Sequence, residues 1–327
     1  MRKIALTVFT FAAALAIANT PAHSQEVQLK FAAWGPPQAP MNRNCAEWAE
    51  MVNREGAGVI KVTVFWNTLG NAATVYDNIK NGVADAGWVL QPLVPGKFPK
   101  TSVVELPGMF KSSEEASNAL WKLYQSGFLK DEYNEIKPLA IVPMTGNRIH
   151  TNQPITDLAS LTGKKYRVAG KTLGDVVSAL GGTGIQMAWT EIPQSLEKGV
   201  IQGTVSPWND FVPGKLAEVT KYHMEIELGM IGGLVAMNQK SYDALNPKAK
   251  AVVDKVSGQY LVTWLSREAD KNQALNRDQV KSMPGHQLIS LSSADQAKMQ
   301  TALKPVIEDW KKRTRGGADI LKQLGTE

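Results

Sequence analysis

The chain has 327 residues, with 36 lysines and arginines against 30 acidic residues, which gives a net charge of +6. Because basic and acidic residues are mixed along the whole chain, this excess suits a small anionic ligand and excludes a nucleic-acid-binding surface. The single cysteine, Cys45, excludes an internal disulfide. It lies on the apolar face Met41, Cys45, Trp48 and Val52 of a predicted helix, which indicates a buried side chain and not a catalytic thiol.

The first 24 residues have the pattern of an export signal. Arg2 and Lys3 precede an apolar run from residue 4 to 18, and Ala22-His23-Ser24 supplies small residues for cleavage after Ser24. The run is too short for a transmembrane helix, and no later uninterrupted apolar stretch is long enough to span a membrane. Removing 24 of the 327 residues, with two cations and no acid, predicts a mature chain of 303 residues and charge +4 outside the cytoplasm.

The first half of the mature chain alternates strands and helices. Residues 28–32, 59–66 and 84–89 are predicted strands, and residues 41–53 and 73–80 are predicted helices between them. This β-α-β-α-β order is typical of an α/β layered domain with a mostly parallel sheet. A capping box formed by Ser112 and Glu115 predicts a further helix that closes near Gly127. Predicted strands at 136–142 and 148–151 follow.

The second half alternates in the same way. The predicted strands are 164–168, 201–205 and 231–237, and the predicted helices are one capped by Thr172 and ending near Leu180, one at 193–198 and one at 293–312. Asn246-Pro247 is a strong helix start. From there to Ser282 only Gly258 interrupts the pattern, which predicts a helix of up to about 35 residues and roughly 50 Å. Such a helix would extend across both domains.

A chain of this size exceeds one comfortable core, so we predict two domains. No motif for catalysis fits: the phosphate-loop and dinucleotide patterns fail on spacing, and there is no nucleophile elbow. His150, His223 and His286 are scattered in the sequence without metal-ligand spacing. We therefore predict no metal site and no cofactor.

Two arginines, Arg148 and Arg167, each stand in a short predicted strand. A guanidinium carries a permanent charge and a planar fork of donors that matches a carboxylate. Arg167 is the predicted carboxylate-binding residue, although most arginines are simply solvated at surfaces.

Five segments, in order, carry a resemblance to a known family: 29–40 (LKFAAWGPPQAP), 81–87 (NGVADAG), 104–110 (VELPGMF), 161–168 (LTGKKYRV) and 197–203 (EKGVIQG). Each is weak alone, but together behind a signal peptide they are specific. The mature chain resembles, over nearly its whole length, the periplasmic solute-binding proteins of tripartite ATP-independent periplasmic (TRAP) transporters, the DctP family.

The resemblance implies a two-lobed α/β clamp with a ligand cleft and a long helix bridging both lobes. Lobe I would comprise residues 25–147 and about 235–273, and lobe II residues 148–234 and about 274–327. It also implies that Arg167, in the pattern Leu161, Gly163, Arg167, pairs with a substrate carboxylate, with Arg148 as a second candidate. Ser206 stands where relatives often have a ligand-binding asparagine, so Asn209 or the Ser206 hydroxyl would replace it.

Several aromatic residues lie at predicted strand ends or loops, where ligand contacts gather in open α/β sheets. These aromatic residues are Trp34, Trp88, Trp189, Trp208 and Phe211. Trp189 stands where the family commonly has proline. A cleft with aromatic walls would suit an aromatic or bulky apolar monocarboxylate, while the alternative is that these side chains only pack the lobes together.

The partners that the resemblance implies are the small and large membrane subunits of an ion-gradient-driven transporter, served by a monomeric protein in the periplasm. Two alternatives remain open at this point. One is an exported α/β enzyme that acts on a small acid through Asp210 or another cleft carboxylate. The other is a binding protein that delivers its ligand to a receptor.

Overall fold

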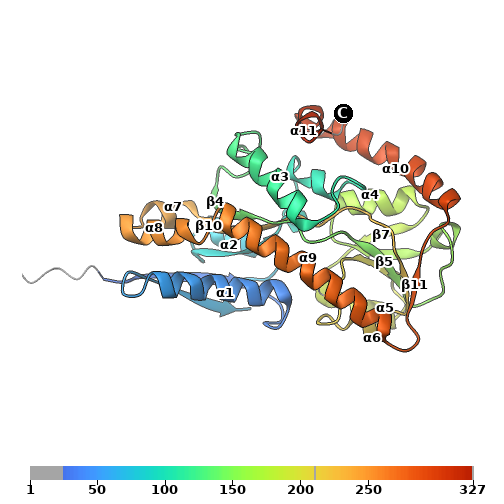
Figure 1. The fold of residues 1–327 in the computed structure, drawn as a ribbon, viewed down its shortest axis with the longest axis horizontal. Helices are drawn as coiled ribbons and strands as arrows, with labels where there is room; N and C mark the ends of the chain where they lie inside the picture. Colours follow the sequence, from blue (N-terminus) through green and yellow to red (C-terminus); the bar gives the residue numbers. More distant parts are fainter. Residues whose placement is uncertain (1–24, 210, 326–327) are drawn as a thin grey trace, which may run out of the picture.

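In the computed structural model, residues 25–209 and 211–325 are described, and they form two lobes, each built on one β-sheet (Figure 1). The predicted signal peptide and Asp210 lie outside the described residues. None of the described helices is long and apolar enough to cross a membrane.

The sheet of the first lobe has the strand order β2-β1-β3-β10-β4. Its strands are β1 (Val27–Ala33), β2 (Ile60–Trp66), β3 (Ala86–Leu90), β4 (Ile136–Ile141) and β10 (Gly233–Asn238). Strand β1 runs parallel to β2 and β3, whereas β10 is antiparallel to both β3 and β4. Strand β10 returns from the second lobe and enters this sheet in the opposite direction.

The sheet of the second lobe has the order β11-β9-β5-β8-β6-β7. Its strands are β5 (Arg148–Thr151), β6 (Lys165–Val168), β7 (Thr183–Gln186), β8 (Gly203–Ser206), β9 (Tyr222–Met224) and β11 (Gln287–Ile289). Strand β6 is parallel to β7 and β8, and β5 is antiparallel to β8 and β9. Both sheets are therefore mixed, and the expectation of mostly parallel sheets overstates their parallel share.

Helices cover both sheets (Figure 1). The α-helices are α1 (Pro40–Glu55), α2 (Val75–Lys80), α3 (Ser113–Gln125), α4 (Lys171–Ala179), α5 (Ile192–Glu197), α6 (Leu216–Val219), α7 (Gln239–Asp243), α8 (Pro247–Lys255), α9 (Gln259–Ser282), α10 (Ser293–Arg313) and α11 (Gly317–Gln323). Short 3-10 turns are η1 (Gln91–Leu93), η2 (Thr101–Glu105), η3 (Ala159–Leu161) and η4 (Trp189–Glu191).

Two of the three predicted helix caps are present. The Ser112 hydroxyl accepts from the Glu115 amide at 3.1 Å, and the Asn246 side chain accepts from the Ala249 amide at 2.9 Å. Thr172, however, is not a cap, because α4 begins at Lys171 and Gly170 holds the N-cap position. Cys45 is buried on α1 as predicted, and burial raises the pKa of its thiol far above the ordinary value.

The predicted continuous helix after Asn246 is wrong. It is divided at Gly258, whose φ of 62° and ψ of −138° no helical residue adopts. The Gly258 amide donates instead to the Leu139 carbonyl of β4 at 2.7 Å. Helix α9 has 24 residues and is about 36 Å long. It packs against α3 and α1 of the first lobe and then runs along the second lobe, where it ends near α5 and α6 (Figure 1).

Three segments join the lobes: residues 142–147 between β4 and β5, residues 225–232 between β9 and β10, and helix α9. Val280 near the end of α9 is buried in a second-lobe cluster with Ile192, Trp208 and Phe211. Strands β1 to β4 fall within the predicted first lobe and β5 to β9 within the second, while β10 begins two residues before the predicted return at 235. The exact lobe boundaries stay a prediction.

Candidate ligand-binding site

Arg167 is buried in the second sheet, on the strand next to its edge strand β7. It lies on β6, opposite Ile185 of β7 and Thr204 of β8, and it is 2% exposed. Its Nε donates to the Met187 carbonyl at 3.1 Å, and no carboxylate of residues 25–209 or 211–325 forms an ion pair with it. Burial lowers the pKa of the guanidinium to about 10, so it stays charged at neutral pH. A buried charge without an opposite charge is costly, which is typical of a functional group awaiting a partner.

Arg167 lines a cavity between the lobes. The other lining side chains are mostly apolar and come from both lobes: Trp34, Pro36, Ala39, Met41, Trp88, Leu90, Met144, Trp189, Pro207 and Ile231. The volume is about 50 Å³, enough for a few water molecules. Three predicted aromatic residues, Trp34, Trp88 and Trp189, therefore lie with Arg167 around one cavity.

The first-lobe tryptophans are held by specific contacts. The Trp34 indole N–H donates to the Trp88 carbonyl at 2.8 Å. The Asn42 amide of α1 donates to the carbonyls of Trp34 and Pro36 at 2.9 and 2.8 Å, which anchors the loop after β1 to the helix that follows it. Gly233 of β10 pairs with Leu90 in the sheet, and a Cβ at Gly233 would collide with the Trp88 indole ring, so the glycine leaves room for that ring.

Trp208 and Phe211 do not face this cavity. Both are fully buried inside the second lobe, where their rings pack on His150 at centroid distances of 4.5 and 4.4 Å. Pro207 lines the cavity, and the next residue, Trp208, points to the opposite side of the strand end. The expectation that these two aromatic residues form cleft walls is therefore corrected to a packing role.

Ser206 and Asn209 make internal hydrogen bonds. The Ser206 hydroxyl bonds the Thr204 hydroxyl at 2.7 Å, and both are buried. The Asn209 amide donates to the Ala269 carbonyl of α9 at 2.8 Å, and its oxygen lies beside the Thr145 hydroxyl, whose one proton it shares with the Gln273 oxygen. Asn209 therefore fastens the second lobe to α9, and neither side chain lines the tryptophan cavity.

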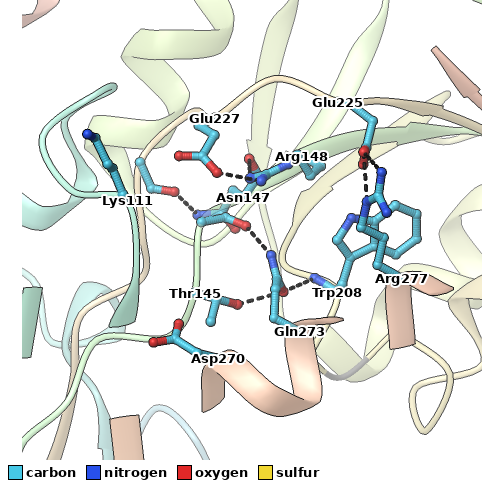
Figure 2. A network of polar contacts seen from close by, with 12 residues as sticks. Lys111, Thr145, Asn147, Arg148, Trp208, Glu225, Glu227, Asp270, Gln273 and Arg277 are labelled. Carbon is cyan, nitrogen blue, oxygen red and sulfur yellow. Dashed lines mark hydrogen bonds and ion pairs between the residues drawn. The ribbon is translucent and has the colours of Figure 1, made fainter. Parts of the chain in front are cut away.

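Arg148 lies where the chain enters the second lobe. Its Nη2 forms an ion pair with Glu227 at 2.5 Å, and Nη1 donates to the Asn147 carbonyl at 3.2 Å (Figure 2). Glu227 belongs to the returning segment 225–232, so this pair joins that connection to the start of β5. Unlike Arg167, Arg148 already has its carboxylate.

Gln273 of α9 ties the connections together. Its carbonyl oxygen accepts from the Thr145 hydroxyl at 2.6 Å and from the Trp208 and Asn209 amides at 2.7 and 3.1 Å. Its amide donates to the Gly146 carbonyl at 3.1 Å. Figure 2 shows this side chain between Thr145 and the main chain of Trp208, with the Arg277–Glu225 ion pair beside it. No sequence motif indicated this network.

The three histidines, scattered in the sequence, form a chain in the fold. His150 and His223 are paired in β5 and β9, with their Nδ1 atoms 3.0 Å apart, and His223 Nε2 lies 2.9 Å from His286 Nδ1. His286 Nε2 meets the Lys221 ammonium at 3.0 Å, and His150 Nε2 meets the Ser206 carbonyl at 3.1 Å. No group that could hold a metal ion occurs among the described residues.

These contacts fix the proton positions along the chain. Lys221 must donate to His286, and the Ser206 carbonyl must accept from His150. Each of the three imidazole rings between the Lys221 ammonium and the Ser206 carbonyl then donates with one nitrogen and accepts with the other. All three rings are therefore neutral. Burial accordingly lowers the pKa of His150 well below its usual range and that of His223 to about 3.

A two-lobed α/β molecule with a cavity lined from both lobes and an unpaired buried cation has the architecture of a solute-binding protein. The family model of bacterial extracellular solute-binding proteins, family 7 (DctP), matches residues 31–313. The C4-dicarboxylate-binding periplasmic protein DctP of Rhodobacter capsulatus is 25% identical over 318 residues, covering 92% of each chain.

Solved structures give the same result. A marine metagenome TRAP solute-binding protein specific for aromatic acid ligands, crystallised with 3-hydroxybenzoate, is 30% identical, with a TM-score of 0.87 and coverage of 92% and 97% of the two chains. A TRAP solute-binding protein from Rhodoferax ferrireducens T118 with copurified benzoate is 28% identical, with a TM-score of 0.85 and coverage of 91% and 96%.

The chain belongs to the DctP family and is a TRAP-type solute-binding protein. Its homologues are solute-binding receptors of a periplasmic transport system, and the two-lobed fold is confirmed.

Proposed function

We propose that this protein captures an aromatic or bulky apolar monocarboxylate and that Arg167 holds the carboxylate. The observation that carries the proposal is a buried guanidinium without a carboxylate partner among the described residues, facing a cavity with three tryptophans. A carboxylate would supply the missing charge through two parallel hydrogen bonds to the terminal nitrogens. Trp34, Trp88 and Trp189 would cover the apolar body of the ligand, since aromatic walls favour aromatic ligands by area and ring geometry.

Capture would proceed by closure of the lobes. Trp34 and Trp88 belong to the first lobe, and Arg167 and Trp189 to the second. The present cavity of about 50 Å³ is smaller than the 300 Å³ or more of ordinary ligand sites. An organic acid therefore enters when the lobes separate, and it gains the contacts of both lobes when they close. The closed state is then populated through its higher affinity for ligand.

The remaining parts of the proposal follow from family membership. The protein delivers its ligand unaltered, as a periplasmic monomer, to the small and large membrane subunits of a TRAP transporter driven by an ion gradient. Arg148 has a bracing role through Glu227. Exported enzyme activity and delivery to a sensory receptor are the competing outcomes.

A thermal-shift screen tests the ligand class. Benzoate, 3-hydroxybenzoate and phenylacetate should raise the melting temperature at millimolar concentration, because a ligand that binds only the folded state stabilises it. Succinate and malate should give a smaller shift. Stabilisation by the dicarboxylates alone contradicts the proposed ligand class, and conversion of a bound acid, detected by mass spectrometry after overnight incubation, contradicts the receptor role.

A further inference from the structure

A second and larger cavity lies between the lobes. Its volume is about 330 Å³, within the usual range for small-molecule sites. Its polar lining includes Gln91, Thr101 and Glu105 of the first lobe and Thr172, Gln186 and Arg313 of the second. We refer to it as the Gln91–Glu105 chamber.

The chamber adjoins the tryptophan cavity. Leu90 and Ile231 line the tryptophan cavity, and the residues directly after them, Gln91 and Gly232, line the chamber. Consecutive Cα atoms are about 3.8 Å apart, so the same two short segments, residues 90–91 and 231–232, border both spaces. The Gln91 amide also donates to the Gly232 carbonyl at 3.0 Å, which holds these two boundary positions together.

Gln91 brings an unsatisfied polar atom to the chamber. Its side chain is 4% exposed, and its amide nitrogen donates to the Tyr133 hydroxyl at 2.7 Å. Its oxygen is buried without a partner in the described part of the chain. If the amide were turned round, the unpaired atom would be the nitrogen, so either orientation leaves one hydrogen-bonding position open. A buried polar atom without a partner is rare and unfavourable.

Glu105 gives the chamber a neutral character. It is 4% exposed, and burial raises the pKa of its carboxyl to about 8, so at neutral pH it is mostly protonated and able to donate. The nearby cations already have partners, because Lys171 and Arg313 both bind Asp175, at 2.9 and 2.7 Å. The described lining of the chamber therefore offers neutral donors and acceptors and no unpaired cation for a second carboxylate, which favours a hydroxyl group.

We propose that the Gln91–Glu105 chamber is a specificity subsite for a hydroxyl group of the ligand, which makes the preferred ligand a hydroxylated aromatic acid extending from Arg167 past the tryptophans to Gln91. This inference rests on the proposed function and adds a second recognition point to it. A hydroxyl can accept from one chamber group and donate to another, which a parent acid without it cannot do.

Calorimetric titration of matched acids tests the subsite. The pairs are benzoate with 3- and 4-hydroxybenzoate, phenylacetate with its 3- and 4-hydroxy derivatives, and 3-phenylpropionate with 3-(4-hydroxyphenyl)propionate. In at least one pair the hydroxylated acid should bind about tenfold or more tightly than its parent, because sites that hydrogen-bond a hydroxyl discriminate strongly against its absence. No preference above twofold in any pair would overturn the inference.

Variants locate the preference. Gln91→Met keeps the side-chain length and removes the amide, and Glu105→Leu removes the carboxyl. Each should reduce the hydroxyl preference to about twofold or less while the parent acid keeps its affinity. Lys171→Ala is the matched control, since Lys171 lines the same chamber but is 71% exposed and paired with Asp175.

Lys171→Ala should keep the preference for the hydroxylated acid, and loss of the preference in this control would contradict the assignment. A preference that survives in both Gln91→Met and Glu105→Leu would also contradict it. If one chamber variant does not fold, the other decides. If no aromatic acid binds, the proposed function itself fails. If the parent acids bind and need Arg167 but hydroxylation has no effect, only the subsite is wrong.

Discussion

At the scale of single residues, the site depends on a contrast between two arginines. Arg148 and Arg167 are both charged and both near the lobe junction, but among the described residues only Arg148 has a carboxylate partner, Glu227. Arg167 is more deeply buried, with one hydrogen bond to a main-chain carbonyl. A buried guanidinium left unpaired lowers the stability of the folded protein. We infer that this destabilisation serves binding, because the carboxylate of the ligand compensates the buried charge.

Replacing Arg167 with methionine should separate binding from stability. Arg167→Met keeps a long side chain and removes the buried charge, so the melting temperature without ligand should stay the same or rise. Affinity for benzoate should fall by about 2–5 kcal/mol, the range for truncating one partner of a buried charge pair. Arg54→Met is the control, because Arg54 is an exposed residue of α1 with a 62% exposed side chain. Benzoate affinity unchanged in Arg167→Met would reject the assignment.

The histidine chain predicts a dependence of stability on pH. His223 has a folded-state pKa of about 3 against about 6.5 in an unfolded chain, so the unfolded state binds more protons between these values. The stabilisation is complete above pH 6.5 and is lost as the pH falls toward 3. Lys221 and Arg148, the cations nearest the chain, further disfavour a charged ring.

Urea unfolding should measure the effect. Between pH 6.5 and 5.0 the free energy of unfolding should fall by about 2 kcal/mol through this group, since each pKa unit corresponds to about 1.4 kcal/mol. His223→Gln lacks the titrating ring and should lose less over the same interval, whatever its stability at pH 6.5. An equal loss in the variant and the native sequence would show that the chain does not couple folding to pH.

Sequence reasoning reached part of this residue-scale description. The motif pointed to Arg167, and positions at strand ends pointed to Trp34, Trp88 and Trp189. The structure brings these four residues around one cavity, and their contact with a ligand stays a prediction. Trp208 and Phe211 were misplaced because residues just beyond a strand can turn to either side. The histidine chain was missed because His150 and His223 are 73 residues apart and meet only through the register of β5 and β9.

At the scale of elements, α9 connects the two lobes through side chains on successive turns. The Asp270 carboxylate accepts from the Ser113 and Glu114 amides at 2.8 and 3.0 Å, which caps α3 of the first lobe from outside. One turn later, Gln273 binds Thr145 and the main chain at Trp208 (Figure 2). The side chains of Asp270 and Gln273, which contact the two sides of the lobe junction, are therefore only about 5 Å apart along the helix axis.

Gln273→Leu should loosen this connection. The change keeps the approximate size of the side chain but leaves the amides of Trp208 and Asn209 without their acceptor, so the free energy of unfolding should fall by about 1–3 kcal/mol. Gln279→Leu is the matched control, because Gln279 lies on the exposed face of the same helix. Equal effects of the two substitutions in denaturant titrations would contradict the role assigned to Gln273.

The order of the long elements was predictable, and the short ones were not. Strands β1 to β6 and helices α1 to α4 follow the apolar periodicity that the sequence displays, and α3 also begins at a cap that the sequence displays. Strands β7, β9 and β11, which have three or four residues each, were not predicted. The division between α8 and α9 depends on the contact of Gly258 with β4, which local sequence does not specify.

At the scale of the whole molecule, both lobes line the candidate ligand site, but its buried cation, Arg167, belongs to the second lobe alone. The first lobe contributes apolar walls, and the second contributes Arg167. The carboxylate can therefore bind the second lobe first, and closure then buries the apolar body. Small-angle X-ray scattering should show a smaller radius of gyration with saturating benzoate than without it. The same radius in both conditions would contradict closure as the capture step.

The most direct test of the account is a crystal structure of the protein with benzoate. Both carboxylate oxygens should lie about 2.7–2.9 Å from the terminal nitrogens of Arg167, as in a charge-assisted pair, with the ring between Trp34, Trp88 and Trp189. Arg148 should keep its ion pair with Glu227. A benzoate bound elsewhere, or one whose carboxylate contacts Arg148 and leaves Arg167 unpaired, would contradict the central claim.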